Sequence, residues 1–361
     1  MLFPIKHASR KSEVFFALNE LLGYFLKKSV NAATFNEKLF KRRLRDAILS
    51  NEPTRKKFED VWNVLQTISK TRRRALSDGF NSCQNISLYY SNKQLALPNI
   101  DAVVADAFAV LSKHLFTNTA KLVDVVTNCG ESIQDHFNAF RDDAINGNVC
   151  CCCGTEVLAQ YRENVEEDDQ WCAPYDHLLS QKEYPIFAVH PENLLPICFT
   201  CNSKAKLAKD LLREPSGNRR FSFFVPESAH ENVTLEINGV VTARIAPSVN
   251  AIFHSTDAIV TEKLRTWDDV YEIKNRVEGE FSSLIEKLSE DFVVDDLAEF
   301  RRQLRPKADR LKILCRKTPW NFWKYKLYEW LASQNDAVIR SVWDAMEAKQ
   351  DDPNAFAVYG I

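Results

Sequence analysis

The sequence predicts a mostly helical, multi-part α+β protein. Long stretches repeat apolar side chains at three- and four-residue spacing, as amphipathic helices do. Residues 219–254 instead alternate apolar and polar side chains, and the pair Asn238-Gly239 lies between two such runs as a hairpin turn. With 361 residues, 45% of them apolar, the chain can bury a sizeable core in two or three packed units.

The helical pattern occupies both ends of the chain. Residues 12–28 open with Ser12, which is suited to N-capping, and continue with apolar residues at helical spacing. The same spacing recurs in residues 34–50, 56–70 and 100–116. It returns after Asp257, and the four tryptophans between Trp320 and Trp343 are expected to anchor helix packing rather than to stack on bases.

Positive charge is concentrated at the start of the chain. Residues 1–80 contain 17 Lys and Arg against 8 Asp and Glu, whereas residues 81–361 contain 30 against 41. Much of the positive charge lies in helix-like stretches, where clusters of cations can follow phosphates. A solvated helix face, or contact with the acidic remainder of the chain, explains the clusters equally well. The hypothesis is that the phosphate contacts are Lys41, Arg42, Arg43, Arg72, Arg73 and Arg74.

The cysteines indicate a reducing environment. No run of about 18 apolar residues occurs, so no membrane span is expected. The first residues place their charges after a short apolar run without a cleavage site, so we expect no signal peptide and a cytoplasmic location. Ten cysteines in such a chain are expected to be reduced thiols or metal ligands rather than disulfides.

Four cysteines stand side by side in the stretch NVCCCCG, residues 148–154. Adjacent side chains point in different directions, so four consecutive thiols cannot easily bind one ion. The usual solution is C-x-x-C, in which two intervening residues form a knuckle. Cys150 and Cys153 have this spacing, and Gly154 follows where a knuckle often needs unrestricted backbone angles.

A second C-x-x-C pair, Cys198 and Cys201, completes a possible ligand set. Two such pairs predict a four-thiolate structural zinc site with a long segment between the knuckles. Cys151 and Cys152 then lie inside the first knuckle, although a shift of register would let either of them serve as a ligand.

The segment between the knuckles carries residues with a shared chemical logic. They are the neighbours Asp176 and His177, then Asn193, and Asn202 directly after the second knuckle. Each alone is a weak signal, because histidines are often structural and asparagines often cap helices. Phosphodiester hydrolysis needs a base and a hard cation. A neutral histidine can be the base, while a carboxylate and an amide oxygen can hold Mg²⁺.

From Cys150 to about Leu212 the chain resembles the HNH endonuclease family, which has a ββα-metal fold. The motifs that carry the resemblance are C-x-x-C-G, then D-H, then N-L-L-P-x-C-x-x-C-N, in that order. The stretch looks most like the zinc-stapled branch found in bacterial and phage proteins, including anti-phage defence nucleases. The resemblance implies a nuclease module (149–215). The helical and alternating patterns on either side of it predict a basic helical region (1–148), a small β region (216–256) and a helical C-terminal region (257–361).

The resemblance also implies roles for individual residues. His177 would be the general base, and Asp176 with Asn202 would hold catalytic Mg²⁺ or Mn²⁺. Asn193 would fix the loop through backbone hydrogen bonds. The structural zinc would be bound by Cys150, Cys153, Cys198 and Cys201. Backbone phosphates would be met by Lys204, Lys206 and Lys209.

The chain departs from the family at several positions. Many relatives place Pro and Gly-Gly after the histidine, where this chain has LLSQKEYP. Many also place a lysine three residues after the last asparagine, where this chain has Ala205. His190 could be an extra ligand or a substrate contact, but a surface-loop histidine is the favoured interpretation. The acidic run 163–171 is expected on an exposed loop or as a shield over the site.

Together these features predict a metal-dependent nuclease that leaves 5′-phosphate and 3′-hydroxyl ends. DNA is the favoured substrate by analogy, an ATPase or sensor protein is an expected partner, and anti-phage defence is an expected setting. The rival hypothesis is a non-catalytic, zinc-stapled scaffold that binds nucleic acid or a partner. Retention of Asp176, His177 and Asn202 favours the enzyme, because a scaffold has no need of a base beside a metal ligand.

Overall fold

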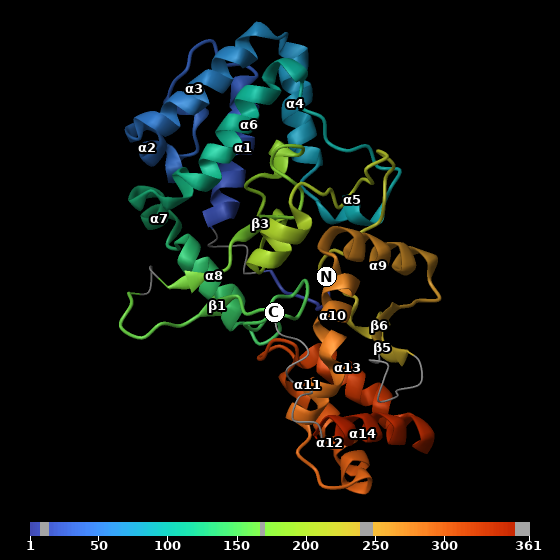
Figure 1. Cartoon of the computed structure of the whole chain (residues 1–361). Helices are drawn as coiled ribbons and strands as arrows, with labels where there is room; N and C mark the ends of the chain where they lie inside the picture. The colour runs from blue at the N-terminus through green and yellow to red at the C-terminus, as the bar shows by residue number, and fades with distance from the viewer. Residues whose placement is uncertain (8–13, 167–169, 239–247, 351–361) are drawn as a thin grey trace. The chain divides into compact units, whose positions relative to one another are not determined.

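The computed structural model describes residues 1–7, 14–166, 170–238 and 248–350 (Figure 1). These residues are mostly helical, with three two-stranded antiparallel sheets, so the predicted fold class is confirmed at this level. The chain forms two compact units. The first comprises Pro4–Gly147 and Leu158–Pro226, and the second comprises Met1–Phe3, Asn148–Val157 and the chain from Glu227 onward. No helix within the described ranges is long and apolar enough to cross a membrane.

Helices form most of the first unit. They are α1 (Val14–Ser29), α2 (Arg42–Ser50), α3 (Glu52–Thr67), α4 (Lys70–Ser82), α5 (Ser87–Ser91), α6 (Ala102–Thr117), α7 (Val123–Cys129) and α8 (Ile133–Asp142). Side-chain caps explain several of their starts: Asn51 caps α3, Ser69 caps α4 and Asp101 caps α6. The predicted cap Ser12 lies outside the described residues. Helix α3 packs on α6, and α1 packs on α4.

One predicted helix is broken. The periodic stretch 34–50 forms a single 3₁₀ turn, Glu37–Leu39, and then a separate helix that begins at Arg42. Between them Phe40 is extended and only 3% exposed. Its ring packs edge-on against Phe58, with centroids 5.1 Å apart. Burial of this aromatic ring accompanies the break, which periodicity alone does not reveal.

Two paired strands lie between the knuckles, and a helical turn begins within the second knuckle and continues past it. Strand β3 (Tyr175–His177) pairs antiparallel with β4 (Leu194–Pro196), so that Asp176 lies opposite Leu195. The π-helical turn Thr200–Lys206 follows. A second small sheet joins β1 (Ala159–Gln160) to β2 (Trp171–Cys172). Of the acidic run, residues 167–169 lie outside the described residues.

The second unit combines one hairpin with a group of helices. Strands β5 (Val233–Asn238) and β6 (Ser248–Phe253) pair antiparallel, and the predicted turn residue Gly239 lies outside the described residues. Helix α13 packs on both β5 and α12. Of the tryptophans in the last two helices, Trp323 and Trp343 are buried, as expected of packing anchors. The helices are α9 (Ala258–Tyr271), α10 (Ile273–Glu280), α11 (Leu284–Asp291), α12 (Leu297–Leu314), α13 (Asn321–Ala332) and α14 (Asp336–Gln350).

Candidate functional site

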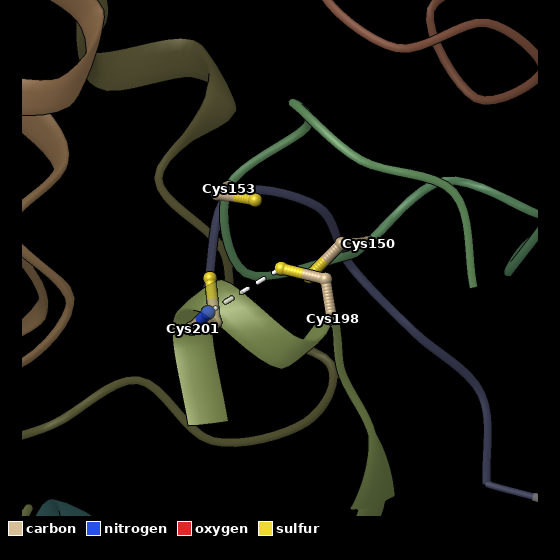
Figure 2. Close-up of side chains that lie close together, drawn as sticks. All are labelled: Cys150, Cys153, Cys198 and Cys201. Atoms are coloured by element: carbon tan, nitrogen blue, oxygen red, sulfur yellow. Dashed lines mark hydrogen bonds between the residues drawn. The ribbon is translucent and has the colours of Figure 1, made fainter. Parts of the chain in front are cut away.

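Four cysteine sulfurs form a cluster that can hold a metal ion. The Sγ atoms of Cys150, Cys153, Cys198 and Cys201 all lie within 4.8 Å of one another, and all four residues are buried. Figure 2 shows the four sulfurs pointing toward one another. Zinc bound tetrahedrally by thiolates at about 2.3 Å keeps its sulfurs about 3.8 Å apart, so the cluster suits zinc. The spacing argument therefore identified the four cysteines that gather, and Cys151 and Cys152 are not among them.

The first knuckle closes through its glycine. The N–H of Gly154 donates to the carbonyl of Cys150 over 2.8 Å, and Gly154 has a φ of +71°. Only glycine adopts this left-handed conformation without strain. A Cβ atom at this position would also lie 2.7 Å from the side chain of Leu2. The predicted need for unrestricted backbone angles at Gly154 is thus confirmed.

The carbonyls around this knuckle are held by donors from distant parts of the sequence. Cys151, Cys152, Cys153 and Gly154 each accept one hydrogen bond through the backbone oxygen. The donors, in that order, are the N–H of Phe3, the indole of Trp267, the indole of Trp323 and the N–H of Trp320, at 3.0, 2.9, 2.7 and 2.9 Å. Because buried carbonyls need partners, these four bonds fix the path of the cysteine run. Sequence reasoning assigned tryptophans to packing but missed this role.

N–H groups also point at the sulfurs. The N–H of Cys201 donates to Cys198 Sγ over 3.4 Å, drawn as the dashed line in Figure 2. The N–H of Thr155 donates to Cys153 Sγ at the same distance. Hydrogen bonds of this kind orient metal ligands and stabilise thiolate charge.

Asp176 and Lys206 form a buried ion pair. The Nζ atom of Lys206 lies 2.6 Å from Asp176 Oδ1, and both side chains are only 4% exposed. The same ammonium donates to the backbone carbonyl of His177 over 2.6 Å. The expected phosphate contact at Lys206 is therefore corrected. Its ammonium is buried and bonds to Asp176 and His177 of β3, so it does not face solvent.

His177 is held as a neutral imidazole with a defined tautomer. Its Nε2 lies 3.0 Å from the carbonyl oxygen of Ala188. A carbonyl can only accept, so Nε2 carries the proton and Nδ1 holds the lone pair of the neutral ring. Burial, which outweighs the Ala188 bond, lowers the pKa of His177 to about 4. The residue as a whole is partly exposed, and its ring packs edge-on against Phe116.

Asn193 fastens the loop that follows His177. It is fully buried, and its Oδ1 accepts from the N–H of Leu179 over 2.7 Å. Its Nδ2 donates to the carbonyls of Leu179 and Phe187, both at 3.0 Å. These three bonds join Leu179, near the start of the segment LLSQKEYP, and Phe187, two residues after its end, to one side chain, which is the kind of role the resemblance implied.

His190 is not a surface histidine. The residue is 5% exposed, and its Nε2 lies 3.0 Å from the carbonyl of Gln84. Its Nδ1 accepts from the N–H of Glu192 over 3.2 Å. With both nitrogens engaged, this ring is a structural element of the loop, which corrects the earlier interpretation.

The remaining residues predicted near the site differ in exposure. Asn202 is partly exposed on the π turn, Lys204 is exposed and Lys209 is half-buried. The ammonium of Lys204 lies 5.7 Å from the ring centroid of Phe199, which is itself 57% exposed. Lys204 is thus the described lysine of this turn that is best placed to meet a phosphate.

Several cations of the amino-terminal clusters serve the fold. Arg43 donates to the carbonyls of Asn128 and Cys129 at the end of α7, and Arg72 makes a bidentate pair with Asp101, both bonds at 2.6 Å. Lys41 pairs with Glu20, and Arg73 donates to Gln66. The other two, Arg42 and Arg74, are exposed, and their side chains make no hydrogen bond or ion pair within the described ranges. Arg42 and Arg74 are therefore the cluster residues whose charges are not engaged in a described hydrogen bond or ion pair, and the hypothesis of six phosphate contacts stays a prediction.

The expected magnesium ligands do not fit a divalent cation as they are arranged. Protein Mg²⁺ sites use one or two carboxylates and keep several waters. Asp176 is 3% exposed, and the ammonium of Lys206 already neutralises it. Asn202 adds an uncharged amide.

In comparisons with known proteins, no protein-family model, curated protein or solved structure matches this chain.

Proposed function

We propose that residues 149–215 form a nuclease module that hydrolyses phosphodiester bonds, with His177 as the general base. The observation that supports this most directly is the tautomer of His177: Nε2 is committed to Ala188, so the lone pair is on Nδ1. A pKa of about 4 keeps the ring neutral at neutral pH, as a base requires. DNA is the first substrate to test, because the resemblance favours it.

The chemistry follows from this placement. Nδ1 takes a proton from water while the water oxygen attacks phosphorus, and the bond from phosphorus to the 3′ oxygen breaks. The leaving oxygen takes a proton from solvent, and the imidazolium returns its proton to solvent because burial disfavours the charged ring. The products carry 5′-phosphate and 3′-hydroxyl ends, which end-labelling distinguishes from 3′-phosphates.

The proposal assigns a structural part to zinc and no catalytic step to Mg²⁺ or Mn²⁺. Zinc on the four cysteines would be structural, since a closed thiolate site leaves no position for substrate. Mg²⁺ or Mn²⁺ on Asp176 and Asn202 remains an implication of the resemblance. Because Lys206 neutralises Asp176, no step is assigned to a divalent ion.

The test is cleavage of supercoiled plasmid, single-stranded DNA and RNA by the purified protein. Each substrate is incubated with added Mg²⁺, with added Mn²⁺ and without either, using the native chain, His177→Ala and the control His254→Ala. His254 follows β6 in the second unit and is an exposed histidine. We expect His177→Ala to lose about 100-fold or more, and His254→Ala to stay active. Equal rates from His177→Ala and the native chain would remove His177 as the base.

A second candidate function is a zinc-stapled scaffold that binds nucleic acid or a partner protein without cutting. The observation that favours it is the buried Asp176–Lys206 pair, which leaves the carboxylate without a catalytic cation. A scaffold predicts DNA binding in a gel-shift assay with no cleavage under any of the conditions above. It also predicts that His177→Ala binds as the native chain does.

A further inference from the structure

Lys206 occupies the position on Asp176 where a cation would act. Its ammonium lies 2.6 Å from the carboxylate of Asp176 and 2.6 Å from the carbonyl of His177. Lysine is almost never fully buried unless it is paired, so the two bonds to Asp176 and His177 account for the burial of Lys206. A single ammonium thus holds the last two residues of β3, including the residue that carries the proposed base.

The π turn explains why Lys206 reaches this position. The N–H of Leu207 donates to the carbonyl of Asn202 over 3.2 Å, a bond between residues five apart. A turn of this kind holds one more residue than an α-helical turn. Ala205 stands where many HNH nucleases place a lysine, and the wider turn brings Lys206 onto β3 instead.

The ion pair and a divalent cation compete for the same carboxylate. Asp176 and Lys206 together carry no net charge, and both are shielded from water. A divalent ion on Asp176 would either lie beside the buried ammonium, where like charges repel strongly, or displace it. Displacement would leave the ammonium of Lys206, a residue only 3% exposed, as a buried charge without its carboxylate, which is strongly destabilising.

We propose that Lys206 is the resident cation of this site. It positions Asp176 and the end of β3, it excludes Mg²⁺ and Mn²⁺ from Asp176, and the hydrolysis at His177 requires no added divalent ion. The activity part of this inference rests on the proposed nuclease function. The ion-binding part does not, because it is measured without substrate.

Mn²⁺ binding to the zinc-loaded full-length chain is the test. The electron paramagnetic resonance signal of free Mn²⁺ falls as the ion binds, and Mn²⁺ does not displace zinc from thiolates. The variants are Lys206→Ala, Asp176→Asn, the two combined, and Lys204→Ala as a matched control from the exposed side of the same turn. Zinc content and circular dichroism report whether each variant folds, and Lys206→Met replaces Lys206→Ala if the cavity prevents folding.

We expect no Mn²⁺ site on Asp176 in the native chain or in Lys204→Ala. Removal of the Lys206 ammonium should create a site, and Asp176→Asn in the same chain should abolish it. A native site that Asp176→Asn removes would overturn the proposal, and so would a folded Lys206 variant that gains no site.

Cleavage without added divalent ion completes the test. We expect activity to persist when Mg²⁺ and Mn²⁺ are left out, and omission is preferable to chelation because chelators would remove zinc. Activity that appears only with added Mg²⁺ or Mn²⁺, and that Asp176→Asn abolishes, would also overturn the proposal. Inactivity under every condition would instead count against the nuclease function and leave the Mn²⁺ result standing.

Discussion

Three histidines of the first unit differ in what their environments let them do. His190 uses both ring nitrogens in hydrogen bonds, whereas His177 commits only Nε2. His136 is 4% exposed, and its Nδ1 lies 2.6 Å from the hydroxyl of Tyr175. Hydrogen-bond partners decide which ring can act as a base, and no motif spacing encodes them.

His136 should make stability depend on pH. Burial lowers its pKa to about 4 from the ordinary 6.5, and the rings of Phe15 and Tyr175 face it. Between these values the unfolded chain binds more protons than the folded one, so this contribution is complete above pH 6.5 and is lost as pH falls toward 4. Urea unfolding measures the free energy of unfolding at pH 7.5 and at pH 5. The decrease between these two pH values should be smaller for His136→Gln than for the native chain. Equal losses would show that His136 does not titrate in this way.

At the residue scale the sequence identified positions better than roles. Asn193 was expected to hold a loop, and its three backbone bonds agree with that role. Lys206 and Arg43 were assigned to phosphates, yet one pairs with Asp176 and the other holds the end of a helix. A cation looks the same in a sequence whether its partner is a phosphate, a carboxylate or a carbonyl, because the partner is set by the fold.

At the scale of elements, residue spacing predicted the features that depend on neighbouring residues in the sequence. Periodicity found the helices, and C-x-x-C found the knuckles, because both depend on a few neighbouring residues. The indole bonds from Trp267 and Trp323 to the cysteine run could not be found this way, since they join residues more than 100 positions apart. The π turn was missed because one extra residue in a turn has no composition of its own.

The cysteine run gives a prediction with internal controls. Cys150→Ser, Cys153→Ser, Cys198→Ser and Cys201→Ser should each lose zinc, because each removes a thiolate from the cluster. Cys151→Ala and Cys152→Ala should keep zinc and lose only modest stability, since both are buried small side chains outside the cluster.

Zinc per purified chain, measured by elemental analysis, checks this expectation. Thermal unfolding beside it separates loss of metal from loss of packing. Equal zinc loss from all six variants would mean that the ligand register differs from the one the sulfur geometry indicates.

At the scale of the whole molecule, the charge polarity of the sequence overstates the surface available to nucleic acid. Lys41, Arg43, Arg72 and Arg73 are engaged within the first unit, so reversing their charges would disturb the fold as well as any interface. Arg42 and Arg74 can be changed without breaking a described ion pair. They therefore test the electrostatic hypothesis more cleanly than the full clusters do.

Arg42→Glu combined with Arg74→Glu should weaken binding to duplex DNA and flatten its salt dependence. Each lost phosphate contact reduces the slope of log K against log salt by about 0.9, so the pair should change it by about 2. Arg265→Glu with Arg310→Glu is a charge-matched control, because both are exposed arginines on helices of the second unit. An equal loss in the control would indicate a net-charge effect, and an unchanged slope in the first pair would place Arg42 and Arg74 outside the interface.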